Sequence, residues 1–132
     1  MRKDDPEGRS QLHYAAAEND AALVSSLISR GEDVNLKDKQ GFTPLHMAAQ
    51  ESSLQAADLL LQHGAYVDSP NTFGNTPLFT AVFNSRGRGD MIKLLRSKGA
   101  DPHYVNKFDQ TPLGLARLIG NYDIARFFAD LE

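Results

Sequence analysis

Four histidines are the side chains of this sequence best suited to bind a metal or to transfer protons: His13, His46, His63 and His103. There is no cysteine, which excludes disulfides, thiolate catalysis and cysteine-ligated zinc. His13 and His46 occupy equivalent positions of a repeated motif that is described below. Equivalent positions on neighbouring packed helices are about 10 Å apart, whereas a metal holds its ligands at about 2 Å. We therefore expect no metal and no cofactor.

The residues around these histidines do not form a pattern typical of catalysis. The sequence shows no Ser–His–Asp order, no carboxylate pair and no phosphate-binding loop, so we expect no enzyme. The segment Ser85-Arg86-Gly87-Arg88-Gly89-Asp90 contains glycines but lacks the flanking strand and helix of a nucleotide loop. An Arg-Gly-Asp adhesion motif is disfavoured, because Asp90 is needed in the first turn of a helix. Two interpretations stay open: a tolerated surface insertion, or a basic, mobile loop whose Arg86 and Arg88 help a partner to dock.

Composition and charge limit the class of protein. The chain has 132 residues, of which 41% are hydrophobic and 23% are charged, as is usual for one soluble domain with a core. A formal net charge of -3 without a basic run argues against nucleic acid as the main partner. The charged start is not a secretory signal, and no apolar run is long enough to span a membrane. We expect a cytoplasmic protein that does not bind membranes and is a monomer when free.

A repeated helix start organises the chain. In Gly41-x-Thr43-Pro44-Leu45, the glycine allows a tight turn, the threonine can cap a helix, and the proline suits the first helical position. The motif returns as Gly74-x-Thr76-Pro77-Leu78, and in weaker form as Gly8-x-Ser10-Gln11-Leu12 and as Thr111-Pro112-Leu113. A repeat with a fixed period predicts a stack of similar units.

A second signal follows each helix start in phase. Gly31, Gly64 and Gly99 each end an apolar run, as expected of the left-handed residue after a helix. Each unit therefore predicts a helix, a short turn, a second helix and an extended loop. Core columns recur between units, and one of them is Leu27, Leu60, Leu95 and Phe128. We expect a charged lead-in at 1–7 and a single domain at 8–132, with units at 8–40, 41–73, 74–108 and 109–132.

This unit, with its Thr43-Pro44-Leu45-His46 opening, resembles the ankyrin repeat family over essentially the whole chain. The resemblance implies an all-α solenoid, in which helix-turn-helix units stack and β-hairpin-like fingers link them. It also implies a concave face made of fingers and first helices, and a structural role for His13 and His46 within their turns. Phe79 and Gly114 depart from the family at this histidine position.

The resemblance further implies partner contacts on the finger tips and on exposed positions of the first helices. These positions are rich in large apolar residues, and five aromatic residues recur along one stripe, which is typical of a protein-binding surface. Alternatively, any one of the aromatic side chains folds against a neighbouring finger and is buried. The expected partner-binding residues are Tyr14, Phe42, Met47, Gln50, Glu51, Phe73, Phe83, Arg86, Arg88, Lys107, Phe108 and Leu118.

The leading interpretation is a non-catalytic protein-protein interaction module that binds a protein partner through its concave face. The chain resembles small free-standing ankyrin proteins that act as stoichiometric inhibitors, above all bacterial immunity proteins, which neutralise a toxin. The partner would then be a toxin or an enzyme that is blocked when bound. The alternative is an adaptor or scaffold module, alone or part of a larger protein, whose partner stays active.

Overall fold

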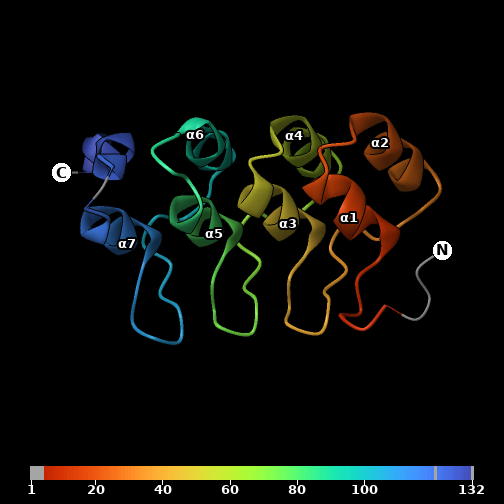
Figure 1. Cartoon of the computed structure of the whole chain (residues 1–132), viewed down its shortest axis with the longest axis horizontal. Coiled ribbons are helices and arrows are strands. Elements are labelled where there is room, and N and C mark those ends of the chain that lie inside the picture. The colour runs from red at the N-terminus through yellow and green to blue at the C-terminus, as the bar shows by residue number, and fades with distance from the viewer. Residues whose placement is uncertain (1–4, 121, 132) are drawn as a thin grey trace.

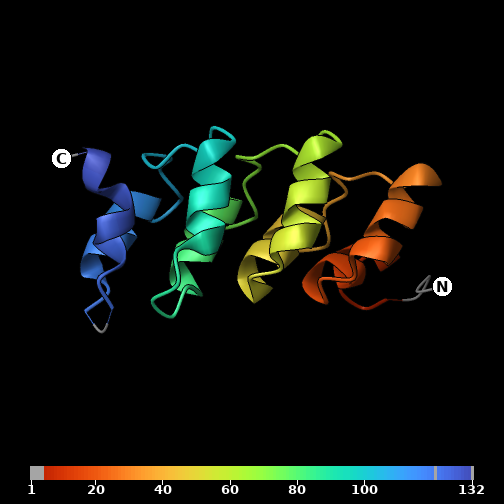
Figure 2. The same cartoon turned by 90° about the horizontal axis from the view of Figure 1, so that it is seen from above.

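The structure, a computed structural model, describes residues 5–120 and 122–131. Its helices are α1 (Gln11–Ala17), α2 (Ala21–Ser29), α3 (Pro44–Glu51), α4 (Leu54–Gln62), α5 (Pro77–Phe83), α6 (Asp90–Ser97), α7 (Pro112–Leu118) and the 3-10 helix η1 (Ile124–Leu131). They form two rows, with α1, α3, α5 and α7 in one row and α2, α4, α6 and η1 in the other (Figure 1). Seen from above, the helix pairs follow one another along the long axis of the molecule (Figure 2).

The described residues contain helices and no strand, which confirms the predicted all-α repeat stack. Within it, α3 contacts α1 on one side and α5 on the other, and α5 also contacts α7. Residues 1–4 of the expected lead-in and Glu132 at the end of the expected fourth unit lie outside the described residues.

The first helix of each pair begins as its sequence predicts. Ser10, Thr43, Thr76 and Thr111 are the N-cap residues, and each hydroxyl accepts a hydrogen bond from the backbone N–H three residues later. Proline follows the cap in α3, α5 and α7, where its missing N–H leaves no helical bond unmade. These caps set the point at which each finger ends and each helix starts.

The second helices end at the expected glycines. Gly31, Gly64 and Gly99 have φ values of 90°, 96° and 92°, in the left-handed region that glycine adopts without strain. The last unit departs from the others, because residues 124–131 form a 3-10 helix that is interrupted at Phe128 (φ -123°, ψ 17°). The Phe128 side chain is nevertheless fully buried and completes the core column predicted from the sequence.

Three fingers, at residues 32–42, 65–75 and 100–110, project from the helices on the side of the first row (Figure 1). Single backbone hydrogen bonds join them: Thr72 N–H donates to the Gln40 carbonyl (2.9 Å), and Lys107 N–H donates to the Phe73 carbonyl (3.1 Å). In the same way, Lys39 N–H donates to the Glu7 carbonyl (2.8 Å), so part of the expected lead-in contacts the first finger.

The fingers also approach closely at Gly41. Its φ is 81°, and a Cβ atom there would lie 2.9 Å from the Cα of Asn71 in the next finger. This position therefore requires glycine twice, once for its backbone conformation and once for the space that the neighbouring finger occupies.

The histidines of the helix starts connect one unit to the next. The Nδ1 atom of His46 accepts from Thr43 N–H (3.2 Å) within its own turn, and its Nε2–H donates to the carbonyl of Asn75 (2.9 Å) in the following finger. His13 does the same with Ser10 (3.0 Å) and Phe42 (2.7 Å). The structural role implied by the resemblance thus extends from the turn to the packing between units.

None of the helices in the described part of the chain has the length and apolar character needed to span a membrane.

Candidate functional site

A groove of about 280 Å³ lies in the corner between fingers and first helices at the centre of the stack. Four aromatic side chains line it: Phe42 and Phe73 from the fingers, and Phe79 and Phe83 from α5. The remaining lining residues are polar: Gln50, Asn71, Asn75, Thr80 and Asn84. We call this site the aromatic groove. It has the composition of a protein-binding pocket, in which an apolar floor is ringed by polar groups.

The aromatic side chains of the groove differ in how much of their surface is exposed and accessible to a partner. Phe83 is 71% exposed and Phe73 is 45% exposed, whereas Phe79 is buried. Phe73 stacks with Phe108, which is 64% exposed, at 6.4 Å between ring centroids. Phe42 is half-buried, with its ring centroid 5.4 Å from that of His46. Phe73, Phe83 and Phe108 therefore provide most of the accessible aromatic surface.

Asn71 fixes the finger that carries Phe73. Its buried Oδ1 accepts from the backbone N–H of Phe73 (2.9 Å) and of Asn75 (3.0 Å), which closes the finger tip. Asp38 and Asn106 do the same in the other two fingers. These three residues were not among those expected from the sequence, although their recurrence in phase with the repeat is a signal that could have identified them.

A smaller polar cavity of about 140 Å³ adjoins the aromatic groove, because Gln50 and Asn84 line both. Its other lining residues are Glu51, Arg86 and Arg88. We call it the arginine pocket. Both arginines are exposed, and neither forms an ion pair with any residue that the structure describes.

The arginines come from the loop between α5 and α6, which is packed against the last unit. A Cβ atom at Gly87 would lie 2.8 Å from the ring of Tyr122, and one at Gly89 would overlap the ring of Phe127. Asp90 begins α6, as the sequence analysis required. The loop is therefore packed against the last unit, which restrains the backbone on both sides of Arg88.

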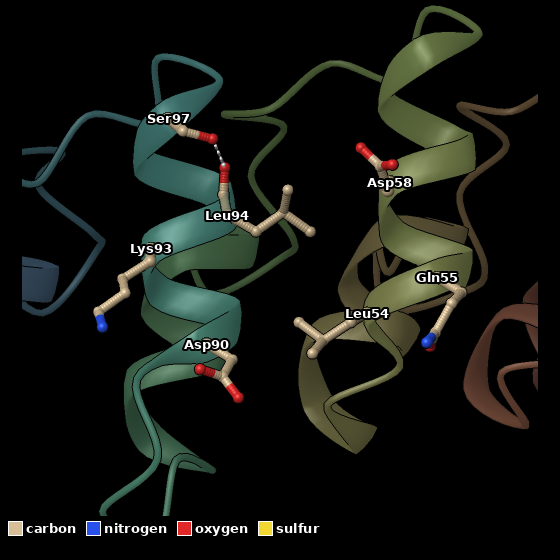
Figure 3. Close-up of a pocket in the computed structure, with 7 residues that line it drawn as sticks. All are labelled: Leu54, Gln55, Asp58, Asp90, Lys93, Leu94 and Ser97. Atoms are coloured by element: carbon tan, nitrogen blue, oxygen red, sulfur yellow. Dashed lines mark hydrogen bonds between the residues drawn. The ribbon is translucent and has the colours of Figure 1, made fainter.

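Two other hollows are less suited to bind a protein side chain. One, of about 550 Å³, lies between α4 and α6 in the second row (Figure 3). The side chains of Leu54 and Leu94 face each other across it, and the rest of its lining is polar or charged (Figure 3). The other, of about 470 Å³, lies between fingers and includes Lys37, Val105 and Lys107. Neither contains a cluster of aromatic rings comparable to that of the aromatic groove.

The structure brings some of the expected partner-binding residues together and separates others. Phe42, Gln50, Phe73 and Phe83 line the aromatic groove, while Glu51, Arg86 and Arg88 join Gln50 in the arginine pocket. Phe108 contacts the groove through Phe73, and Lys107 lines the hollow between fingers. Leu118 is 72% exposed on α7 but lines none of these cavities.

Two of the expected partner-binding residues are less exposed than a binding surface requires. Met47 is only 6% exposed, because α3 is flanked by α1 and α5 on its two sides. Tyr14, at the equivalent position of α1, is half-buried, and its hydroxyl donates to Asp5 (2.5 Å). The expectation of an exposed Met47 is therefore wrong, and Tyr14 belongs to the packing of the N-terminal end.

His13 and His46 contribute to the packing between units. Burial lowers the pKa of His46 to about 4, despite the opposing effect of its hydrogen bond to Asn75, and burial also lowers the pKa of His13. Within the described residues, no group of three or more histidine or carboxylate side chains could hold a metal ion.

The comparisons with known proteins agree with this architecture. A family model described as ankyrin repeats (3 copies) matches residues 12–106, and a second, described as ankyrin repeats (many copies), matches residues 85–129. No curated protein matches the sequence. Ankyrin repeats are generally protein-interaction modules and are typically non-catalytic. On these matches, which together span most of its length, the chain belongs to the ankyrin repeat family.

Proposed function

We propose that this protein is a non-catalytic module that binds a protein partner through the face formed by its fingers and first helices, and that the aromatic groove is the centre of that interface. The observation that carries the proposal is the accessible aromatic surface of Phe73, Phe83 and Phe108 beside polar side chains. Interface hot spots are enriched in such aromatic anchors, and they cluster near the middle of the contact.

The dimensions of this face suit a stable interface. Four units at about 10 Å each give a face roughly 40 Å long, and a standard interface buries about 800 Å² on each partner. The face is also preorganised, because each finger is closed by an Asp or Asn side chain and bonded to its neighbour. A surface that is ordered before binding loses less conformational entropy on association, which favours tight complexes.

The finer proposal is that binding inhibits the partner. A rigid face of this size would cover the partner's active cleft and act as a stoichiometric inhibitor, as an immunity protein does with a toxin. The second candidate is an adaptor or scaffold, whose partner would remain active. The preorganised face supports the inhibitor, because such a face favours tight binding, whereas an adaptor is expected to bind more weakly.

The test uses a variant of the full chain in which Phe73, Phe83 and Phe108 are all replaced by Ser. Its matched control replaces Arg30, Gln62 and Lys98 by Ser, because these exposed residues lie at the ends of second-row helices, outside the proposed face. Both variants should keep the helical circular dichroism of the original protein. A partner recovered from the native host should bind the original and the control but not the groove variant.

The activity of the recovered partner then decides between the two candidates. Full loss of activity at a one-to-one molar ratio supports the inhibitor, and unchanged activity in the complex supports the adaptor. If the groove variant still binds the partner, the proposed interface is wrong. If the groove variant unfolds, these side chains are part of the core and not of a binding surface.

A further inference from the structure

The two adjoining cavities have complementary chemistry. We infer that the partner presents one short segment in which a large apolar side chain, seated in the aromatic groove, is flanked by a carboxylate, seated in the arginine pocket. This inference rests on the proposed function and adds to it the chemistry that the partner must carry. It concerns Arg86 and Arg88, which the groove itself does not include.

The apolar half of the segment follows from the lining of the groove. Phe73 and Phe83 leave large parts of their side chains exposed, and the buried Phe79 also lines the groove. An aliphatic or aromatic side chain placed here removes apolar surface from water on both sides of the contact. The polar residues at the edge, such as Gln50 and Asn84, then remain available at the border of the interface.

The acidic half follows from the unpaired arginines. Arg86 and Arg88 are the cationic groups of the arginine pocket, and the described part of the chain supplies no carboxylate that pairs with either. The two side-chain amides in the pocket are already engaged: Gln50 donates to Glu51 (3.1 Å) and Asn84 to the Thr80 carbonyl (2.9 Å). Each amide keeps one further N–H, but the guanidinium groups are the charged donors of the pocket, and a carboxylate matches their fork geometry.

Glu51 selects between anions of different charge. It lies in the same pocket, so the pocket has two cationic groups and one anionic group. A single carboxylate from the partner brings the net charge of the pocket to zero, whereas a phosphate group, with about -1.5 to -2 charge at neutral pH, leaves uncompensated negative charge beside Glu51. The charge balance therefore favours a Glu or Asp side chain of the partner over a phosphorylated residue.

The distance between the two cavities limits the spacing on the partner. Because Gln50 and Asn84 line both cavities, the cavities share a border. Three residues of extended chain span about 10 Å, so the apolar residue and the carboxylate should be within three residues of each other. The segment thus has a recognisable pattern: a large apolar residue with Asp or Glu one to three positions away.

The experiment selects peptides from a phage-displayed library of random 12-residue sequences on the immobilised full chain. Enriched peptides should share a large apolar residue with Asp or Glu within three positions. The best peptide is then synthesised in three forms: unchanged, with its acidic residue replaced by the amide, and with that residue replaced by phosphoserine. Each is titrated against the original protein, against Arg86→Gln/Arg88→Gln, and against the control Arg30→Gln/Lys98→Gln, which removes two exposed charges elsewhere.

The arginine variant should bind the unchanged peptide about three- to tenfold more weakly, and the control should bind it as the original does. The amide peptide should bind the original protein about as weakly as the unchanged peptide binds the arginine variant. The amide peptide and the arginine variant together should show no further loss of affinity. Enriched peptides without acidic residues, or additive losses, would overturn the inference. If the phosphoserine form binds more tightly than the unchanged peptide, the arginine pocket prefers a phosphate, and the inferred carboxylate is wrong.

The same titrations separate this inference from the proposed function. If Phe73→Ser/Phe83→Ser abolishes binding but the arginine variant does not weaken it, the groove binds apolar side chains and only the acidic half is wrong. If the peptides bind the phenylalanine variant as well as the original, they contact another surface and the proposed interface itself fails.

Discussion

His46 shows how a side chain with catalytic potential is committed to packing. The backbone N–H of Thr43 can only donate and the carbonyl of Asn75 can only accept, so the ring between them must be neutral, with its proton on Nε2. Protonation of Nδ1 would place a second hydrogen against the Thr43 N–H. Burial and the Thr43 N–H both disfavour the charged form, and burial outweighs the hydrogen bond to Asn75, which favours it.

This arrangement predicts that stability depends on pH through His46. Its pKa is about 4 in the folded protein and about 6.5 when unfolded. The contribution to stability is complete above pH 6.5 and is lost as the pH falls toward 4, because the unfolded chain then binds the proton first. The free energy of unfolding should fall by roughly 2–3 kcal/mol between pH 7.5 and pH 4.5 from this residue alone.

Urea unfolding of the original protein and of His46→Gln at both pH values measures this contribution. Carboxylates and His13 titrate in both proteins, so the difference between the two pH dependences isolates His46. The variant should lose less stability on acidification than the original does. Parallel pH dependences would contradict the proposed role of the neutral ring.

Asn71 gives a second prediction at the scale of one residue. Asn71→Ala leaves the N–H groups of Phe73 and Asn75 without their acceptor, which should cost about 1–3 kcal/mol in the free energy of unfolding. Asn71→Asp is the matched control, because Asp38 closes the first finger with the same two bonds. Chemical denaturation should find the aspartate variant close to the original, and equal losses in both variants would show that the acceptor oxygen is not what matters.

At the scale of elements, the loop between α5 and α6 and the terminal helix η1 depend on each other. The ring of Phe127 occupies the space beside Gly89, and the Nζ of Lys93 in α6 lies 5.4 Å from the centroid of the same ring. Arg96 adds a paired contact, donating to Asp130 (2.7 and 2.8 Å) and to the Phe127 carbonyl (3.0 Å). A 3-10 helix is intrinsically weak, so these contacts, together with the buried side chains of Ile124 and Phe128, hold η1 in place.

Gly89→Ala should therefore displace η1. The added methyl group overlaps the Phe127 ring, and overpacking of this kind costs about 1–3 kcal/mol. Hydrogen exchange should become faster in residues 124–131 than in α3 and α4. Gly120→Ala is the control, since no atom lies within 4 Å of a Cβ at that position. Uniform exchange over the whole chain in Gly89→Ala would mean that η1 does not move separately.

The elements themselves could largely be predicted from the sequence, because their signals are local. Thr43 with Pro44, and Gly64 after α4, act within one turn of backbone, and the structure has them as cap, first helical residue and left-handed terminus. The 3-10 form of η1 could not be predicted, since its apolar positions are in register with the earlier second helices. The expected β-hairpin-like fingers contain no strand in the described residues, because each finger shares only single hydrogen bonds with its neighbour.

At the scale of the whole molecule, the sequence could name Phe42, Gln50, Phe73 and Phe83 but could not show that they line one groove, because the groove belongs to no single unit. Phe73 and Phe83 lie on different elements, and only stacking brings them to one groove. Met47 shows the same limit: its exposure is decided by helices on both sides of α3, not by the pattern of α3 itself. The role of a residue within its own unit can be predicted from the repeat. The exposure of a residue at the contact between units depends instead on the neighbours of that unit.

This dependence on neighbours gives a prediction for the core column Leu27, Leu60, Leu95 and Phe128, whose side chains are all buried. In a linear stack, an inner unit is stabilised by two interfaces and an end unit by one. Leu60→Ala or Leu95→Ala should lower the free energy of unfolding by about 2–5 kcal/mol while keeping one cooperative transition. Leu27→Ala should instead release the first pair, α1 and α2, and Phe128→Ala should release η1, before the rest unfolds.

Hydrogen exchange under native conditions, followed along the chain, distinguishes these cases, because it reports each helix separately. Inner variants should exchange faster in all helices together, since weakening the centre lowers the stability on which every unit depends. End variants should lose protection at one end while α4 and α6 stay protected. Equal loss along the chain in all four variants would indicate a single indivisible core, and the interface would then be no more rigid at its centre, around Phe73 and Phe83, than at its ends.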